Sequence, residues 1–246
     1  EVKIVHKTSA AKKLTRRILM QQEDWPHWRN AEHAQLDQYD STGMFGTPVP
    51  IPNDAPVFYW VWIYVLKSNA NELRRKARAA CDGSPKRGHA IIHGYTFTST
   101  PDHTDTRLFV ALSVYHGLLM FGTDVINAFA EAKPGKQRYY MYVDEQFRNW
   151  WTTRNKGALP KSHVIPILMN LQGHPEAPRQ WAIHIHAILV DIGFVSCTHA
   201  KCLYKGTFDG DNIFILRQVD DFSIAAKSFQ MYNMICDKID THLHNP

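Results

Sequence analysis

The sequence has no long hydrophobic run, few cysteines and no internal repeat, and each of these absences excludes a class of protein. The longest unbroken apolar run, Val57 to Leu66, has ten residues, about half of the ~20 that cross a bilayer, so we expect no membrane partner. The first twenty residues hold no continuous hydrophobic segment of the kind that directs secretion. Four cysteines in 246 residues fit a reducing compartment better than a disulfide scaffold.

The composition is that of a globular protein. Hydrophobic residues make up 44% of the chain and aromatic residues 12%, which is enough to form a substantial core in one large or two small globular units. Because the chain begins at Glu1 rather than Met, we expect it to be a piece of a longer protein.

One stretch of the chain is strongly basic. Residues 67–88 contain seven basic and two acidic residues and carry a local charge of +5, equal to the net charge of the whole chain. Such a run is either a solvated loop or helix face, or a surface that contacts phosphates. Nothing in the local sequence decides between these two interpretations.

Hydrophobic spacing predicts helices and strands in a mixed order. Helices are expected over residues 9–20, 24–39, 104–120 and 177–192 and from residue 228 onward. Strands are expected over residues 57–66, 123–126, 139–143, 202–208, 212–218 and 222–226. Asp209-Gly210 predicts a hairpin turn, and the composition of residues 41–56 is typical of a connector. Helices and antiparallel hairpins that share one sheet indicate an α+β fold.

Three acidic residues lie at the ends of predicted strands. Asp220 and Asp221 form a tight turn between two apolar strands, and Asp124 ends a strand nearly a hundred residues earlier. Turns favour aspartate for structural reasons alone, but a central antiparallel sheet can bring these strand ends together. Three carboxylates held close repel one another unless cations neutralise them, as in sites that hold two divalent metals about 4 Å apart. Mg²⁺ suits such oxygen ligands.

Cys197, His199 and Cys202 form a second candidate metal site, for zinc. A structural zinc site needs four ligands in paired spacings, and the sequence provides no second Cys/His pair of that kind. A zinc-dependent interaction module is therefore the weaker alternative.

Several motifs follow one another in a fixed order. They are Asp124-Val125-Ile126-Asn127-Ala128-Phe129, the segment from Leu171 to Trp181, Cys202-Leu203-Tyr204 and Gln218-Val219-Asp220-Asp221. In order and spacing they resemble the motifs of the reverse transcriptase domain of copia-type long-terminal-repeat retrotransposons, over about residues 24–240. The last motif resembles the Tyr-Val-Asp-Asp box of that family, with Gln218 in place of the usual tyrosine.

The resemblance implies a right-hand polymerase in which fingers and palm surround a central antiparallel sheet, with the thumb largely missing. It divides the chain into an N-terminal helical lead-in and connector (1–56), the fingers with the first palm helix (57–121), and a palm that carries the catalytic carboxylates (122–246). Fingers and palm would be interleaved.

The resemblance also implies an activity, RNA-directed DNA synthesis from dNTPs on a primed RNA or DNA template, with two Mg²⁺ ions or Mn²⁺. Asp124, Asp220 and Asp221 would be catalytic and, with the carbonyl of Val125, would bind the metals. Four further residues would bind substrate: Phe129 as a steric gate under the sugar, Gln172 beside the nucleotide, and Arg78 and Lys67 on its triphosphate.

The remaining partners would be the rest of a retrotransposon polyprotein, with integrase upstream and RNase H downstream. The location would be intracellular, in a cytoplasmic particle, the nucleus or both. The alternative is a catalytically decayed or repurposed retroelement fragment that binds nucleic acid.

Overall fold

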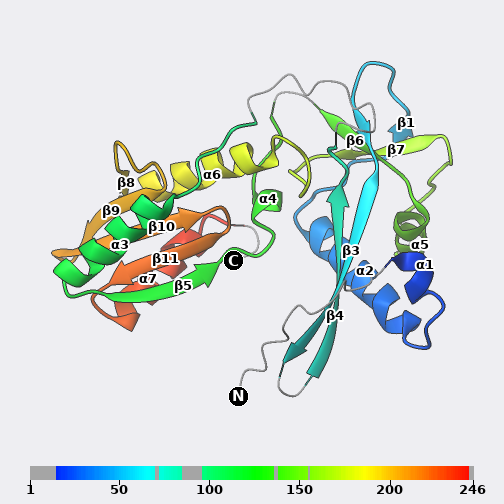
Figure 1. The fold of residues 1–246 in the computed structure, drawn as a ribbon. Helices are drawn as coiled ribbons and strands as arrows, with labels where there is room; N and C mark the ends of the chain where they lie inside the picture. The colour runs from blue at the N-terminus through cyan, green and yellow to red at the C-terminus, as the bar shows by residue number, and fades with distance from the viewer. Residues whose placement is uncertain (1–14, 70–71, 85–95, 136–137, 155, 244–246) are drawn as a thin grey trace. The chain divides into compact units, whose positions relative to one another are not determined.

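The computed structural model describes residues 15–69, 72–84, 96–135, 138–154 and 156–243 (Figure 1). The chain folds into two compact units, the first from residues 1–91 and 137–174 and the second from residues 92–136 and 175–246. Both units combine helices with sheets, so the α+β prediction is confirmed. The predicted division into fingers and palm, with boundaries at residues 56 and 121, stays a prediction.

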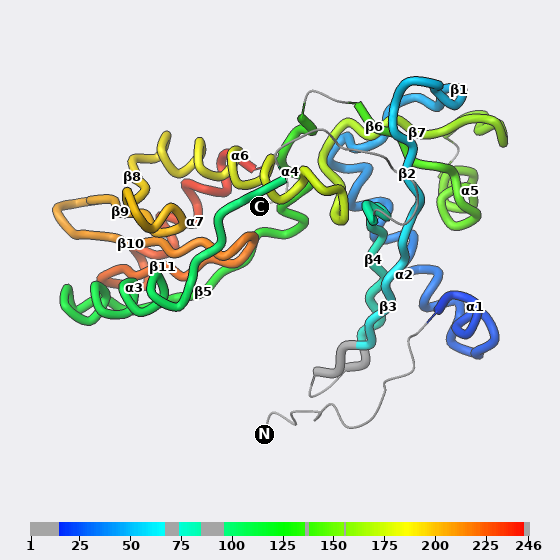
Figure 2. Tube along the Cα trace, turned by 45° about the horizontal axis from the view of Figure 1, so that its top comes forward, coloured from blue at the N-terminus to red at the C-terminus, as the bar shows by residue number. Residues whose placement is uncertain are grey.

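The first unit contains a long two-stranded ribbon and a small mixed sheet. The ribbon pairs β3 (Trp60–Asn69) with β4 (Glu72–Cys81), and the two strands run side by side in Figure 2. The sheet has the order β1-β7-β6-β2, with β2 parallel to β6. Its strands are β1 (Val49–Pro50), β2 (Val57–Phe58), β6 (Tyr139–Tyr142) and β7 (His163–Ile167). The helices of this unit are α1 (Arg16–Leu19), α2 (Trp25–Ser41) and α5 (Glu145–Thr153).

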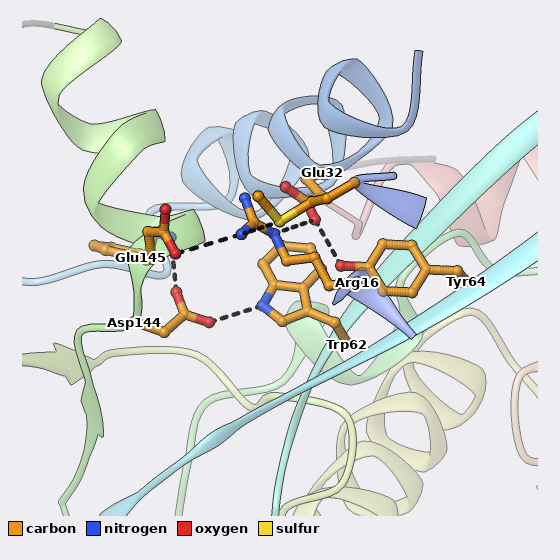
Figure 3. A network of polar contacts seen from close by, with 8 residues as sticks. Arg16, Glu32, Trp62, Tyr64, Asp144 and Glu145 are labelled. Atoms are coloured by element: carbon orange, nitrogen blue, oxygen red, sulfur yellow. Dashed lines mark hydrogen bonds and ion pairs between the residues drawn. The ribbon is translucent and has the colours of Figure 1, made fainter. Parts of the chain in front are cut away.

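A buried polar network joins the elements of the first unit (Figure 3). Glu32 of α2 accepts hydrogen bonds from Tyr64 of β3 at 2.6 Å and from Arg16 of α1 at 3.2 Å. Asp144 caps α5 through the Phe147 amide and accepts a hydrogen bond from Trp62 at 2.8 Å. Burial raises the pKa of both carboxyl groups, Glu32 and Asp144, and their partners moderate that effect. The network fixes α1, α2 and α5 against the ribbon.

The second unit is a five-stranded antiparallel sheet covered by helices on both faces. The strand order is β5-β11-β10-β9-β8. The strands are β5 (Leu119–Asp124), β8 (Val195–Ser196), β9 (Leu203–Phe208), β10 (Asp211–Gln218) and β11 (Asp221–Ala226). The helices are α3 (His103–Tyr115), α4 (Ala128–Glu131), α6 (Ala177–Asp191) and α7 (Phe229–Asp240).

The hydrophobic run of β10 explains why this sheet is buried on both sides. Ile213 and Ile215 point into a core formed with α6 and α7, whereas Phe214 and Leu216 point into a second core under α3. Side chains alternate between the faces of a strand, so an uninterrupted apolar run requires cover on both faces. Figure 2 shows α3 on one side of the sheet and α6 on the other.

Several predicted boundaries were wrong. The helix expected over 104–120 ends at Tyr115, because Gly117 turns the chain in a left-handed conformation (φ 64°) and residues 119–124 form β5. Of the strand expected over 123–126, only Thr123 and Asp124 are strand, at the end of β5. The strand expected over 57–66 is divided into β2 and β3 at Tyr59. The helix expected over 9–20 begins outside the described residues, which contain α1.

The basic segment is mostly strand where it is described, and only residues 82–84 lie outside a strand. Residues 72–81 form β4, whose paired register with β3 runs from Asn69↔Glu72 to Trp60↔Cys81. Within the described part of the chain, no helix is both long and apolar enough to cross a membrane.

Candidate active site

A strained two-residue turn joins β10 to β11. Gln218 and Asp221 are paired, so Val219 and Asp220 form the turn between them. Val219 has a left-handed backbone conformation with φ 60°. A β-branched residue rarely adopts this conformation, because its side chain crowds the backbone. Such strain persists only where the surroundings impose it, and it is concentrated at functional sites.

Helix α6 holds the strained turn in place. The indole Nε1–H of Trp181 donates a hydrogen bond to the carbonyl oxygen of Val219 at 2.7 Å. Trp181 is completely buried, and Val219 packs against the same core cluster. The position of Asp220 is therefore coupled to α6 through its neighbour in the turn.

The end of β5 lies beside this turn. Asp124 is the cross-strand partner of Asp221, and the amide of Val125 donates a hydrogen bond to the carbonyl oxygen of Asp220 at 3.0 Å. Directly paired residues of an antiparallel sheet project from the same face, with Cβ atoms about 4.5–5.5 Å apart. The structure thus brings Asp124 and Asp221 to opposite positions and places Asp220 next to them.

All three carboxylates are open to a ligand. Their side chains are exposed, and none forms a hydrogen bond or ion pair with a residue that the structure describes. Across the described ranges, however, no group of three or more His, Cys, Asp or Glu side chains is close enough to hold a metal ion as it stands. The donor set consists of hard oxygen atoms and suits Mg²⁺ or Mn²⁺, but its atoms have to move closer together to bind a shared ion.

The zinc alternative finds no support in the geometry around Cys202. Its thiol is buried and donates a hydrogen bond to the carbonyl oxygen of Ser99 at 3.2 Å. Burial raises the pKa of both Cys197 and Cys202, which disfavours the thiolate form that zinc requires.

Val125 and Phe129 lie close to the carboxylates along the chain. The Val125 side chain is buried in the core, so only its backbone can supply a metal ligand. Phe129 lies in α4, and its partly buried ring packs against the same core. Asn127, with φ 51°, turns the chain from the end of β5 into α4. The residue predicted to be the steric gate therefore lies on a short helix directly after this turn.

The other predicted substrate residues lie in the first unit, on or beside the β3–β4 ribbon. Strand pairing places Arg74, Lys76 and Arg78 in one row beside the exposed Val61, Ile63 and Val65. Lys67 pairs with Arg74 through the backbone, but its side chain lies outside the described residues. The ribbon face thus combines a basic row with an apolar row.

Gln172 is fixed at the end of β4. Its carbonyl oxygen accepts a hydrogen bond from the amide of Cys81 at 2.7 Å. The next residue, Gly173, has φ 89°, and a Cβ atom there would lie 2.1 Å from the carbonyl oxygen of Cys81. Only glycine permits this close approach. Gln172 and Arg78 therefore belong to the same unit and to adjoining parts of it.

Two residues with structural roles at these sites were not singled out from the sequence. Trp181 holds the carboxylate turn, and its place at the end of the second motif was the only signal of its importance. His174 follows Gly173 and stacks on Tyr139, with ring centroids 4.2 Å apart. Burial lowers the pKa of His174 to about 4.

Comparisons with known proteins identify the family of the chain. A family model described as "Reverse transcriptase (RNA-dependent DNA polymerase)" matches residues 47–244. The chain is 22% identical over 218 residues to the "Retrovirus-related Pol polyprotein from transposon RE1" of Arabidopsis thaliana, and 23% identical over 229 residues to the polyprotein from transposon RE2 of the same plant. These matches cover 86% and 91% of the chain but only 14% and 15% of the relatives, so the chain spans about a seventh of their length.

Proposed function

The chain belongs to the reverse transcriptase (RNA-dependent DNA polymerase) family, and we propose that it adds dNTPs to a primer on an RNA or DNA template by two-metal nucleotidyl transfer. The observation that carries the proposal is the pairing of Asp124 with Asp221 beside the strained turn that bears Asp220. This arrangement unites acids from distant parts of the sequence without giving any of them a structural partner among the described residues.

Two Mg²⁺ or Mn²⁺ ions would supply charge neutralisation and would orient the nucleotide phosphates. The proposed ligands are the carboxylates of Asp124 and Asp220 and the carbonyl of Val125, with Asp221 as the third acid. Trp181 and the Val219 turn set the position of Asp220 before substrate arrives, and such preorganisation is a main source of catalysis in phosphoryl transfer.

The remaining roles concern substrate. We assign the triphosphate to Arg78 and Lys67, the base-proximal contact to Gln172, and sugar selection to the ring of Phe129. In our proposal the chain functions within a retrotransposon polyprotein, between an integrase and an RNase H region. It would act inside the cell, in a cytoplasmic particle, the nucleus or both.

A primer-extension assay tests this proposal. The purified chain, and a longer form that continues beyond residue 246, are given an RNA template, a DNA primer, dNTPs and Mg²⁺. Asp124→Asn and Asp220→Asn should each abolish extension. Asp209→Asn is the matched control, because Asp209 is an exposed turn aspartate with φ 51° at the opposite end of β10. Full extension by Asp220→Asn would refute the assignment.

A second candidate function is nucleic-acid binding without catalysis. It is favoured by Gln218, which stands where the family box has tyrosine, and by the lack of a ready metal-binding group among the described residues. One experiment distinguishes the two functions. A chain that binds a primed template but extends nothing with either Mg²⁺ or Mn²⁺, even in the longer form, supports the second.

A further inference from the structure

An open cleft of about 920 Å³ lies between α2 and α5 in the first unit. Its volume is in the range of ligand-binding clefts, about 300–1,000 Å³. Helix α2 supplies side chains at intervals of four residues, so they follow one side of the helix. The lining contains Arg29, His33, Asp37, Arg148, Thr152 and Arg154, together with two asparagines and a second threonine.

The acidic group of this lining, Asp37, already accepts hydrogen bonds from two side chains of the protein. One oxygen accepts hydrogen bonds from the indole of Trp150 at 2.8 Å and from Nε of Arg154 at 2.9 Å, and the other accepts from Nη2 of Arg154. These hydrogen bonds, led by that of Arg154, hold the pKa of Asp37 below its usual range. Asp37 therefore neutralises Arg154 and leaves the other two arginines of the cleft uncompensated.

Those two arginines differ in how they are held. Arg148 is partly buried, and its Nη1 donates to the carbonyl oxygen of Leu159 at 2.6 Å, which orients the guanidinium group and leaves its other N–H groups for a ligand. Arg29 is exposed and makes no hydrogen bond or ion pair with the described residues. His33 lies between the helices, and its pKa is lowered by burial and then by the charges of Arg154 and Arg29. The cleft thus has a positive potential.

The neutral lining groups add donors but no stacking surface. Two amides and two threonine hydroxyls accompany the arginines, and the residues that the structure places along the cleft include no aromatic ring apart from the His33 imidazole. Guanidinium, amide and hydroxyl groups bind phosphate oxygens, whereas recognition of bases in single strands depends on aromatic stacking. The lining is therefore suited to a phosphate backbone rather than to bases.

We propose that the α2–α5 cleft binds phosphate groups of a nucleic-acid strand, independently of its sequence. The choice of nucleic acid as the source of the phosphates rests on the proposed function. None of the residues assigned to the polymerase site lines the cleft, so the cleft would be a separate binding site for template or primer.

The test compares Arg29→Glu with Arg17→Glu. Both residues are exposed arginines of the first unit, and both variants change the charge equally, but Arg17 lies on α1 outside the cleft. Binding of a labelled single-stranded RNA is measured by fluorescence anisotropy at several salt concentrations. Arg29→Glu should weaken binding about tenfold and reduce the salt slope by about 0.7 for each phosphate that is no longer neutralised, while Arg17→Glu should change affinity less than about twofold.

Thr152→Glu provides a second variant that leaves every arginine in place and should weaken binding in the same direction. Equal affinities of Arg29→Glu and Arg17→Glu would overturn the proposal. Inorganic tripolyphosphate serves as the other probe, because loss of tripolyphosphate binding with unchanged RNA binding would also overturn the nucleic-acid assignment.

The experiment separates this proposal from the polymerase proposal. Primer extension at saturating template measures catalysis by the carboxylates, whereas RNA affinity measures binding in the cleft. If the protein extends primers but Arg29→Glu leaves its RNA affinity unchanged, only the cleft proposal is refuted. If the protein extends no primer but Arg29→Glu still weakens RNA binding more than Arg17→Glu does, only the polymerase proposal is refuted.

Discussion

The indole of Trp181 and the carbonyl of Val219 are joined by a hydrogen bond of 2.7 Å. This bond connects α6 to a turn whose backbone is strained and whose second residue is Asp220. Removing it should release the turn without opening a large hole in the core.

Trp181→Phe removes the donor and keeps an aromatic ring. We expect it to lower the free energy of unfolding by about 1–2 kcal/mol, because the carbonyl of the half-buried Val219 loses its partner. The kcat of primer extension should fall about tenfold while the KM for dNTP stays within about twofold, since Asp220 is displaced but the β3–β4 ribbon is untouched. Trp151→Phe, which loses an indole hydrogen bond to another backbone carbonyl, that of Gly157 at 3.1 Å, is the control for stability alone. A Trp181→Phe enzyme with unchanged kcat contradicts the positioning role.

Phe129→Ala should increase the use of ribonucleotides relative to deoxynucleotides. A ring beneath the sugar excludes a 2′-hydroxyl by its volume, a difference of about 1–3 kcal/mol. The measured quantity is the ratio of kcat/KM for dNTP and rNTP, so a general loss of activity from the disturbed core cancels. An unchanged ratio would mean that Phe129 serves packing alone.

Arg78→Ala should raise the KM for dNTP with a smaller effect on kcat, because Arg78 belongs to the basic row of the ribbon. Arg75→Ala is its control. Arg75 lies on the other face of β4, where its guanidinium pairs with Asp24 at 2.7 Å. If both variants have the same KM for dNTP, the basic segment is a solvated face that does not bind the triphosphate.

Gly173→Ala should destabilise the first unit by more than about 2 kcal/mol and displace Gln172. The new Cβ would combine backbone strain with a clash against the Cys81 carbonyl at 2.1 Å. Gly157→Ala isolates the strain term, because Gly157 has a similar φ of 92° and open space around its Cβ position. Thermal unfolding of the two variants gives the cost of the clash as their difference, and equal losses would show that the close approach does not matter.

His174 should make the first unit sensitive to acid. Burial lowers its pKa from 6.5 to about 4, so the unfolded chain binds the proton more tightly than the folded one. The stabilising contribution is complete above pH 6.5 and is lost as the pH falls through about 4, by about 3 kcal/mol in all. Urea unfolding between pH 7 and 4 should show a shallower fall for His174→Gln than for the parent, with the exposed His27→Gln following the parent.

Strands β9, β10 and β11 of the second unit were predictable because their signals are local. The apolar run from Ile213 to Leu216 and the turn at Asp209-Gly210 identify β9 and β10 without long-range information. Strand β4 was missed because its outward positions are basic, and a strand with one charged face resembles a solvated helix in composition. Helix α5 was missed although its signal is local, because its buried rings Phe147, Trp150 and Trp151 follow the i, i+3, i+4 spacing of one helix face.

The site was predictable as a set of residues but not as a geometry. Register between β5 and β11 depends on packing of strands nearly a hundred residues apart, so the direct opposition of Asp124 and Asp221 appears only in the folded chain. The same holds for the left-handed Val219, since valine carries no local preference for a positive φ.

The two strands that carry the paired aspartates are held unequally. Strand β11 has a hydrogen-bonded neighbour on each side, β5 and β10, whereas β5 is the outer strand of the sheet within the described chain. Asp221 is therefore held in place, whereas Asp124 is the member of the pair that can move. A strand that is hydrogen-bonded to one neighbour can slide or tilt at a lower free-energy cost than a strand between two neighbours. Amide hydrogens of β5 should exchange faster than those of β11 in the free protein, and saturating Mg²⁺ with dNTP and a primed template should slow the exchange of β5 far more than that of β11.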